Sequence, residues 1–256
     1  MTTAARPVDR QRRSAGQRRR SPGWLPNQHG AWVMLAAPLL LGALATGPRW
    51  GHLLLAVFWA LGYFAFFASG LWLKSHRKAR YLPPVRAYGL ATAVAGAAVL
   101  AVQPSLARWA PLFVPPLVVG LVASAERQDR ALLSGVATAA GSCLMAPVAY
   151  DLGGGTDWQR AWLMAAVLGA YFAGTVFYVK NLIRERDSRL HYWLSVGFHA
   201  VATFAMLAVS PWAAALFAAL TARAAIVPRL HPSPKQAGIG EIAGTVLAAL
   251  VALLAA

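Results

Sequence analysis

The residues of this chain with the clearest chemical potential form one stretch, Tyr178 to His191, in which a long apolar run ends in closely spaced charges. Those charges are carried by Lys180, Arg184, Glu185, Arg186, Asp187 and Arg189. Ionisable side chains at the mouth of a hydrophobic bundle cost free energy unless they are paired or wetted, so the stretch marks a candidate site. Its basic side chains have the chemistry to bind carboxylate or phosphate, which arginine holds through two parallel hydrogen bonds.

The composition indicates that lipid surrounds most of the chain. Hydrophobic residues make up 58% of the sequence and charged residues 12%, whereas a soluble domain usually has about 25% charged residues. The formal charge of +16 does not indicate a nucleic-acid partner, because the basic residues lie between apolar segments instead of on one soluble face. We therefore expect membrane lipids as partners and no nucleic acid.

Nine apolar segments are long enough to cross a bilayer, since a helix needs about 20 residues to do so, with a range of about 17 to 25. They are 31–47, 51–73, 87–103, 109–125, 131–150, 158–179, 192–209, 211–227 and 238–256. The pattern predicts an all-α polytopic membrane protein with about nine transmembrane helices, the first a permanent span and not a signal peptide. Around Ser210 and Pro211, one broken hairpin is the alternative to two spans.

The distribution of basic residues predicts the orientation. Residues 1–23 carry seven arginines and little apolar surface, which is typical of a disordered basic tail ahead of a transmembrane domain at 24–256. Thirteen more basic residues fall in the loops on the same side as the tail, at 74–86, 126–130, 180–191 and 228–237, which makes twenty of the 24. The positive-inside rule then places the N-terminus in the cytoplasm and the C-terminus outside, in a multi-pass protein of the cell (plasma) membrane.

Other polar groups are predicted on the cytoplasmic side. Gln28 and His29 precede the first span, either as a turn and loose cap or as cavity residues whose histidine changes charge near neutral pH. Lys74, Arg77 and Lys78 would share a helical face if the second span continues beyond Lys74, and would otherwise be a solvated basic loop. In the loop 126–130, we expect the mixed charges to pair with each other or with neighbouring loops.

Three ionisable residues lie within the later spans. His199 is either a satisfied core histidine or a site residue, and Arg223 lies near the cytoplasmic end of its segment. Glu241 lies one turn into the last segment, where a lone carboxylate needs a partner. We predict that Glu241 pairs with Arg184, Arg186, Arg223 or His29.

These groups together predict a single cytoplasm-facing cationic cavity. Its candidate residues are Gln28, His29, Lys74, Arg77, Lys78, Glu126, Arg127, Lys180, Asn181, Arg184, Glu185, Arg186, His199, Arg223, Lys235 and Glu241. No catalytic role is assigned to any of them, and we expect no metal and no cofactor. The single cysteine, Cys143, excludes an intramolecular disulfide and a cysteine-based metal site.

Prolines and small residues interrupt several spans. Pro38, Pro111, Pro115, Pro116 and Pro147 are expected to kink helices and free carbonyls for neighbouring helices, with a broken-helix ion site as the alternative. The small residues Gly89, Ala93 and Ala97 recur at helical spacing and are expected to form a close packing face.

Several stretches together resemble the YwiC-like family of bacterial membrane proteins. They are Pro26 to Trp32 with Pro38, the Glu126-Arg127 region, Ile183 to Arg186 followed by His199, and Lys235 with Gly238-Ile239 and Glu241. The resemblance extends from about Trp24 to the C-terminus and implies the architecture, whereas the family is functionally uncharacterised and implies no activity.

The nine segments and the positions of the richest loops, after the second and sixth, are also similar to UbiA-type prenyltransferases. Those enzymes hold Mg²⁺ and a prenyl diphosphate with aspartate-rich loops, because hard cations need carboxylate oxygens. Here the first loop has no carboxylate, and the second offers only Glu185 and Asp187. A cationic cavity could instead hold an anionic headgroup directly.

We therefore expect a multi-pass membrane protein with a cationic cavity for an anionic or amphiphilic small molecule, such as an isoprenoid. Whether the protein is an enzyme stays open. The alternatives are a UbiA-like transferase acting on a lipid or isoprenoid, and a small-molecule transporter.

Overall fold

The computed structural model describes residues 23–26 and 29–255, and every regular element in these residues is a helix. The basic tail, Gln28 and the side chain of His29 lie outside the described part. The α-helices are α1 (His29–Thr46), α2 (Trp50–Lys74), α3 (Leu82–Val102), α4 (Ala110–Ala125), α5 (Leu132–Cys143), α6 (Met145–Leu152), α7 (Trp158–Ile183), α8 (Arg189–Leu207), α9 (Pro211–Ile226) and α10 (Pro234–Ala255). Short 3-10 helices lie at η1 (Ala79–Tyr81), η2 (Pro104–Trp109) and η3 (Val227–Leu230).

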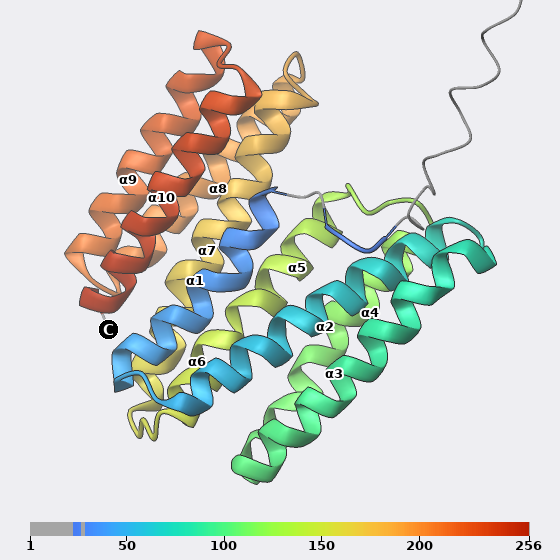
Figure 1. Ribbon diagram of the computed structural model, residues 1–256. Helices are drawn as coiled ribbons and strands as arrows, with labels where there is room; N and C mark the ends of the chain where they lie inside the picture. Colours follow the sequence, from blue (N-terminus) through green and yellow to red (C-terminus); the bar gives the residue numbers. More distant parts are fainter. Residues whose placement is uncertain (1–22, 27–28, 256) are drawn as a thin grey trace, which may run out of the picture.

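The predicted polytopic helical fold is confirmed. Eight helical segments of the described chain are long and apolar enough to cross a membrane, with α5 and α6 forming one of them, and α1 is a shorter apolar helix beside them. Figure 1 shows the helices side by side as one bundle. The outer surface is apolar, as Leu90, Val201, Phe204 and Leu254 show, because lipid and not water is its solvent.

Two separate helices meet at Ser210 and Pro211. The Ser210 hydroxyl accepts hydrogen bonds from the backbone N–H groups of Trp212 and Ala213, and Pro211 occupies the first turn, where its missing N–H has no cost. The hydroxyls of Thr203 and Thr221 are hydrogen-bonded between α8 and α9, 3.0 Å apart. The two segments are therefore an antiparallel pair of full helices.

Helix α7 holds the main core together. It packs against α1, α5, α6, α8, α9 and α10. Its side chains Met164, Leu168, Tyr171 and Phe172 are almost fully buried, in one apolar cluster with Phe217 of α9. Positions along α7 are thus set by neighbours on several sides, which makes it the most constrained helix of the bundle.

The proline in α1 lies inside a continuous helix. Pro38 has no N–H for the carbonyl of Met34, and the Ser142 hydroxyl of α5 donates to that oxygen instead. The Leu35 carbonyl, in the same turn, accepts from the Trp59 indole N–H of α2 at 3.1 Å. Both carbonyls are therefore satisfied by neighbouring helices, which is the packing role predicted for this proline and not an ion site.

A second helical segment, which packs against α1, is interrupted. The segment Leu132–Leu152 is broken at Leu144, between α5 and α6, shortly before Pro147. At Gly42, α1 crosses α6 so closely that a Cβ there would overlap the Ala146 carbonyl oxygen and lie 2.9 Å from the Ala149 Cβ. Pro111, in contrast, lies in the first turn of α4 and kinks nothing.

The predicted small-residue face on α3 is wrong. Nothing lies within 4 Å of a Cβ built on Gly89, and Ala93 and Ala97 are exposed. The face toward α2 instead includes Thr92, which meets Gly62, and Gly96, which meets the Phe58 ring. Small residues at helical spacing occur on both faces of α3, so the spacing alone could not choose the buried one.

We predict that Gly42→Ala destabilises the protein by about 1 to 3 kcal/mol, because the added methyl meets backbone that has to move. Gly89→Ala is the matched control, with open space around it and an expected gain of up to about 1 kcal/mol from helix propensity. Thermal unfolding in detergent measures both. Equal effects of the two substitutions would contradict the close crossing.

Candidate functional site

Most of the described basic residues lie at one end of the bundle, which we call the basic end. It contains the loops after α2, α4, α7 and α9 and is the upper end in Figure 1. The sequence predicts that this end faces the cytoplasm.

A partly buried ion pair lies inside this end. Arg223, in the last turn of α9, places its Nη1 2.9 Å from Oε1 of Glu241 in α10. The other carboxylate oxygen accepts hydrogen bonds from the hydroxyls of Tyr171, at 3.0 Å, and Thr175, at 2.7 Å, both from α7. The predicted pairing of Glu241 with a basic residue is confirmed, and Arg223 is its partner.

The guanidinium of Arg223 uses little of its hydrogen-bonding capacity. It lies over the Tyr178 ring, 4.2 Å from the ring centre, an arrangement that favours a cation. Its Nε and Nη2 atoms are buried without any partner in the described structure. Because an arginine carries five N–H donors, much of its hydrogen-bonding capacity is unused here.

A cavity of about 420 Å³ opens beside this pair. It is lined by Tyr178, Arg223, Val227, Leu230, His231, Pro232, Gln236, Ala237, Gly240 and Glu241. The walls therefore come from α7, α9, η3, the loop that follows η3, and the start of α10. Of the predicted cavity residues whose side chains the structure describes, Arg223 and Glu241 are the two that line it.

The charged end of α7 lies near this cavity without lining it. Arg186 donates to the carbonyls of Leu182, at 3.1 Å, and Pro232, at 3.4 Å, and so ties the end of α7 to the loop before α10. Glu185 lies 3.8 Å from His191, across the turn into α8. Arg184 and Lys235 are exposed, and Lys180 is half-buried.

Two predicted residues are buried in the core beside α8. His199 is 1% exposed, donates from Nδ1 to the Ser195 carbonyl oxygen at 2.7 Å, and packs its ring against Gly174. It is thus a packed core histidine. Asn181 is also 1% exposed, but neither its amide oxygen nor its amide nitrogen has a partner in the described part of the chain.

The loops after α2 and α4 form a separate cluster. Lys74 pairs with Asp129 at 2.8 Å, and Arg127 is 2.9 Å from His76, so the mixed loop pairs with its neighbour as predicted. Helix α2 ends at Lys74, and His76 and Arg77 adopt left-handed backbone conformations. The shared helical face predicted for Lys74, Arg77 and Lys78 therefore does not form, and Arg77, Lys78, Glu126 and Arg127 are exposed.

Sequence reasoning missed several lining or bonding residues. Tyr171, Thr175 and Tyr178 are spaced by four and three residues along α7, which places their polar groups on one face of an otherwise apolar span. This spacing is the feature of the sequence from which these residues could have been predicted. His231 and Gln236 gave no such signal, because His231 lies in a short polar connection and Gln236 in the first turn of the helix that follows it.

The structure thus defines a multi-pass helical membrane protein with a partly buried ion pair and a cavity at its basic end. A family model described as YwiC-like protein matches residues 25–150. The uncharacterized protein YwiC of Bacillus subtilis is 31% identical over 204 residues, which are 80% of this chain and 82% of that protein. The chain belongs to the YwiC-like family.

A second relative extends the similarity over almost the whole chain. An uncharacterized protein of Haemophilus influenzae is 25% identical over 237 residues, which are 90% of this chain and 98% of that protein. No solved structure matches this chain. In the described residues, no three histidine, cysteine, aspartate or glutamate side chains are grouped closely enough to hold a metal ion.

We predict that Arg223→Gln destabilises the protein by about 3 to 5 kcal/mol, because it leaves the Glu241 carboxylate without its counter-charge inside the bundle. The double variant Arg223→Gln/Glu241→Gln should recover most of this loss. Denaturant unfolding in micelles compares the two. A double variant as unstable as the single one would show that the charge pair is not what stabilises this end.

The Lys74–Asp129 pair should make stability depend on pH. Burial acts to raise the pKa of Asp129, but the hydrogen bond and charge of Lys74, with the backbone and Arg130, lower it below its ordinary value of 3.8. The stabilisation is therefore present above pH 3.8 and is lost as the pH falls through the lower folded-state pKa. Both side chains are partly exposed, so the pair contributes at most about 1 kcal/mol.

We therefore expect Asp129→Asn to lower stability by up to about 1 kcal/mol at neutral pH and by progressively less below pH 3.8. Unfolding of wild type and variant across this pH range measures the difference. Asp187→Asn, which removes an exposed carboxylate with no ion pair in the described structure, is the control. A difference that grows toward low pH would contradict the assignment.

Proposed function

We propose that this protein binds a small anionic or amphiphilic molecule in the cavity at its basic end, with Arg223 as the anchor. The observation that carries the proposal is a guanidinium that lines the cavity while only its Nη1 is hydrogen-bonded. A carboxylate or phosphate is the ligand group that satisfies such donors, and arginine binds it in a two-pronged geometry.

The charges around the cavity favour an anion. Glu241 is the one acidic side chain of the lining, and its oxygens already accept from Arg223, Tyr171 and Thr175. Arg186 and Arg229 lie close to the opening, bonded to Pro232 and Tyr192, and Lys235 is exposed at the start of α10. An incoming cation would meet no free carboxylate, whereas an anion would enter a region of positive potential.

The size and walls of the cavity favour a ligand with an apolar part. Its volume of about 420 Å³ is within the usual range for small-molecule sites, about 300 to 1,000 Å³. Val227, Leu230 and Ala237 supply apolar wall, and Gln236 and His231 supply hydrogen-bonding groups. A short isoprenoid or acyl chain bearing a phosphate or carboxylate combines these features.

The charge asymmetry supports a position in the plasma membrane with this cavity open to the cytoplasm. A transferase or a carrier for the same anion would use the same cavity. The backbone carbonyls near Pro38 accept hydrogen bonds from Ser142 and Trp59, so they are not free to bind a transported ion. This proline therefore does not favour transport.

Geranyl monophosphate is a suitable probe, with geraniol as its uncharged counterpart. We expect the phosphate to raise the melting temperature of the purified protein in detergent, because a ligand that binds only the folded state stabilises it. Glu241→Gln should strengthen the response by releasing Nη1 of Arg223. The double variant Arg223→Gln/Glu241→Gln should abolish it while keeping the fold.

Arg86→Gln is the matched control, because it removes an exposed positive charge from the same end outside the cavity. Its response should equal that of wild type. Equal stabilisation by geraniol, or an undiminished response in the double variant, would overturn the proposal.

A further inference from the structure

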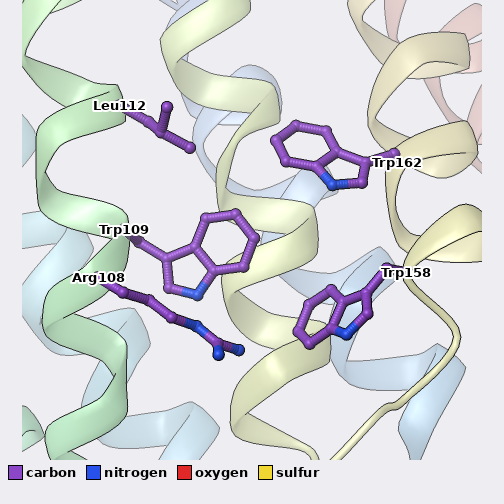
Figure 2. Close-up of a pocket in the computed structure, with 5 residues that line it drawn as sticks. All are labelled: Arg108, Trp109, Leu112, Trp158 and Trp162. Atoms are coloured by element: carbon purple, nitrogen blue, oxygen red, sulfur yellow. The ribbon is translucent and has the colours of Figure 1, made fainter.

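A second hollow lies at the opposite end of the bundle from the residues described above. Figure 2 shows the indoles of Trp109, Trp158 and Trp162 around it, with Leu112 and Arg108 completing the lining. Its volume is about 270 Å³. Arg108, Trp109 and Leu112 come from the end of η2 and the first turn of α4, and the other two tryptophans from the first turns of α7.

The arginine in this hollow is held by a buried carboxylate. Nη2 of Arg108 is 2.8 Å from Oδ1 of Asp151, and the Trp109 indole N–H donates to Oδ2 at 2.7 Å. Asp151 belongs to α6, behind the hollow, and its side chain is 10% exposed. The guanidinium lies 5.0 Å from the Trp158 ring centre and 5.8 Å from that of Trp109. It is therefore fixed in direction while 53% exposed.

Hydrogen-bond donors remain unused around this hollow. The guanidinium has further N–H groups beyond the one directed at Asp151. Neither the Trp158 nor the Trp162 indole N–H bonds to any residue of the described chain. Both indoles and Leu112 are partly exposed, at 37%, 43% and 44%. The hollow thus combines donors with apolar surface that faces the surroundings of the bundle.

The occupant that matches these features carries an anionic group and an apolar chain. A cationic headgroup is disfavoured, because Arg108 already occupies the position over the indole faces where an ammonium would bind. A free anion would leave the indole faces and Leu112 uncovered. Tryptophans are also the side chains that suit the level of lipid headgroups.

We propose that this hollow binds the phosphate of a glycerophospholipid from the leaflet at this end, with the phosphate on the exposed guanidinium of Arg108 and the apolar part of the lipid on the indole rings. An acyl chain then runs along Leu112 and Trp162, between α4 and α7. The site uses none of the residues of the basic-end cavity, so it does not depend on the function proposed for that cavity.

Native mass spectrometry with phosphatidylglycerol tests the site, with diacylglycerol as the lipid lacking phosphate and inorganic phosphate as the anion lacking a chain. The double variant Trp158→Ala/Trp162→Ala removes the indole rings that would cover the apolar part of the lipid. We expect it to weaken phosphatidylglycerol binding about tenfold. Arg108→Gln/Asp151→Asn, which removes the charge pair together, should weaken binding at least as much.

The control is Trp50→Ala/Trp212→Ala, which removes two exposed indoles at the same end outside the hollow. This variant should bind like wild type. Should Arg108→Gln/Asp151→Asn fail to fold, the tryptophan variant still decides the matter, since its residues are partly exposed and make no hydrogen bond. The proposal is overturned if diacylglycerol binds equally well, if inorganic phosphate alone prevents lipid binding, or if the control loses as much.

Discussion

The carboxylate of Glu241 joins three helices at one point. It takes a salt bridge from Arg223 of α9 and two hydroxyl hydrogen bonds from Tyr171 and Thr175 of α7, while belonging to α10 itself. A charge within a membrane bundle is tolerated only when the protein supplies its partners. The orientation of α10 against α7 and α9, and hence the cavity between them, follows from this requirement.

The same requirement acts on the backbone in the other part of the bundle. Pro38 has no backbone N–H to donate within α1. The carbonyls of the preceding turn therefore accept hydrogen bonds from Ser142 and Trp59. Gly42 has no side chain, so α1 and α6 can approach closely near these hydrogen bonds. Lipid can supply neither charge partners nor hydrogen bonds, so both the site and the crossing are built from side chains of several helices.

The spans were predictable, because the thickness of the bilayer fixes the length of an apolar segment. The ends of the helices were harder to predict from the sequence. Helix α2 stops at Lys74 through left-handed conformations at His76 and Arg77, and neither residue type signals such a turn. This stop is why the first basic loop does not extend α2 as a ligand-binding face.

The site was predictable in part for a similar reason. The need of Glu241 for a counter-charge follows from its depth alone, but its choice of Arg223 depends on how α9 and α10 pack. The expected single cavity does not gather its candidates, because Lys74 and Asp129 neutralise each other in another loop pair. The tryptophan hollow could not be foreseen, since Trp109 and Trp158 meet only through the packing of α4, α5 and α7.

Helix α7 has a consequence for the whole molecule. It runs without a proline or a break from Trp158 to Ile183, carrying Trp158 and Trp162 at one end and Tyr171, Thr175 and Tyr178 toward the other. The tryptophan hollow at one end of the bundle and the hydroxyl groups that hold the Glu241 carboxylate toward the other are therefore built on one continuous helix, so the distance between the two features is set by the rise of a single element.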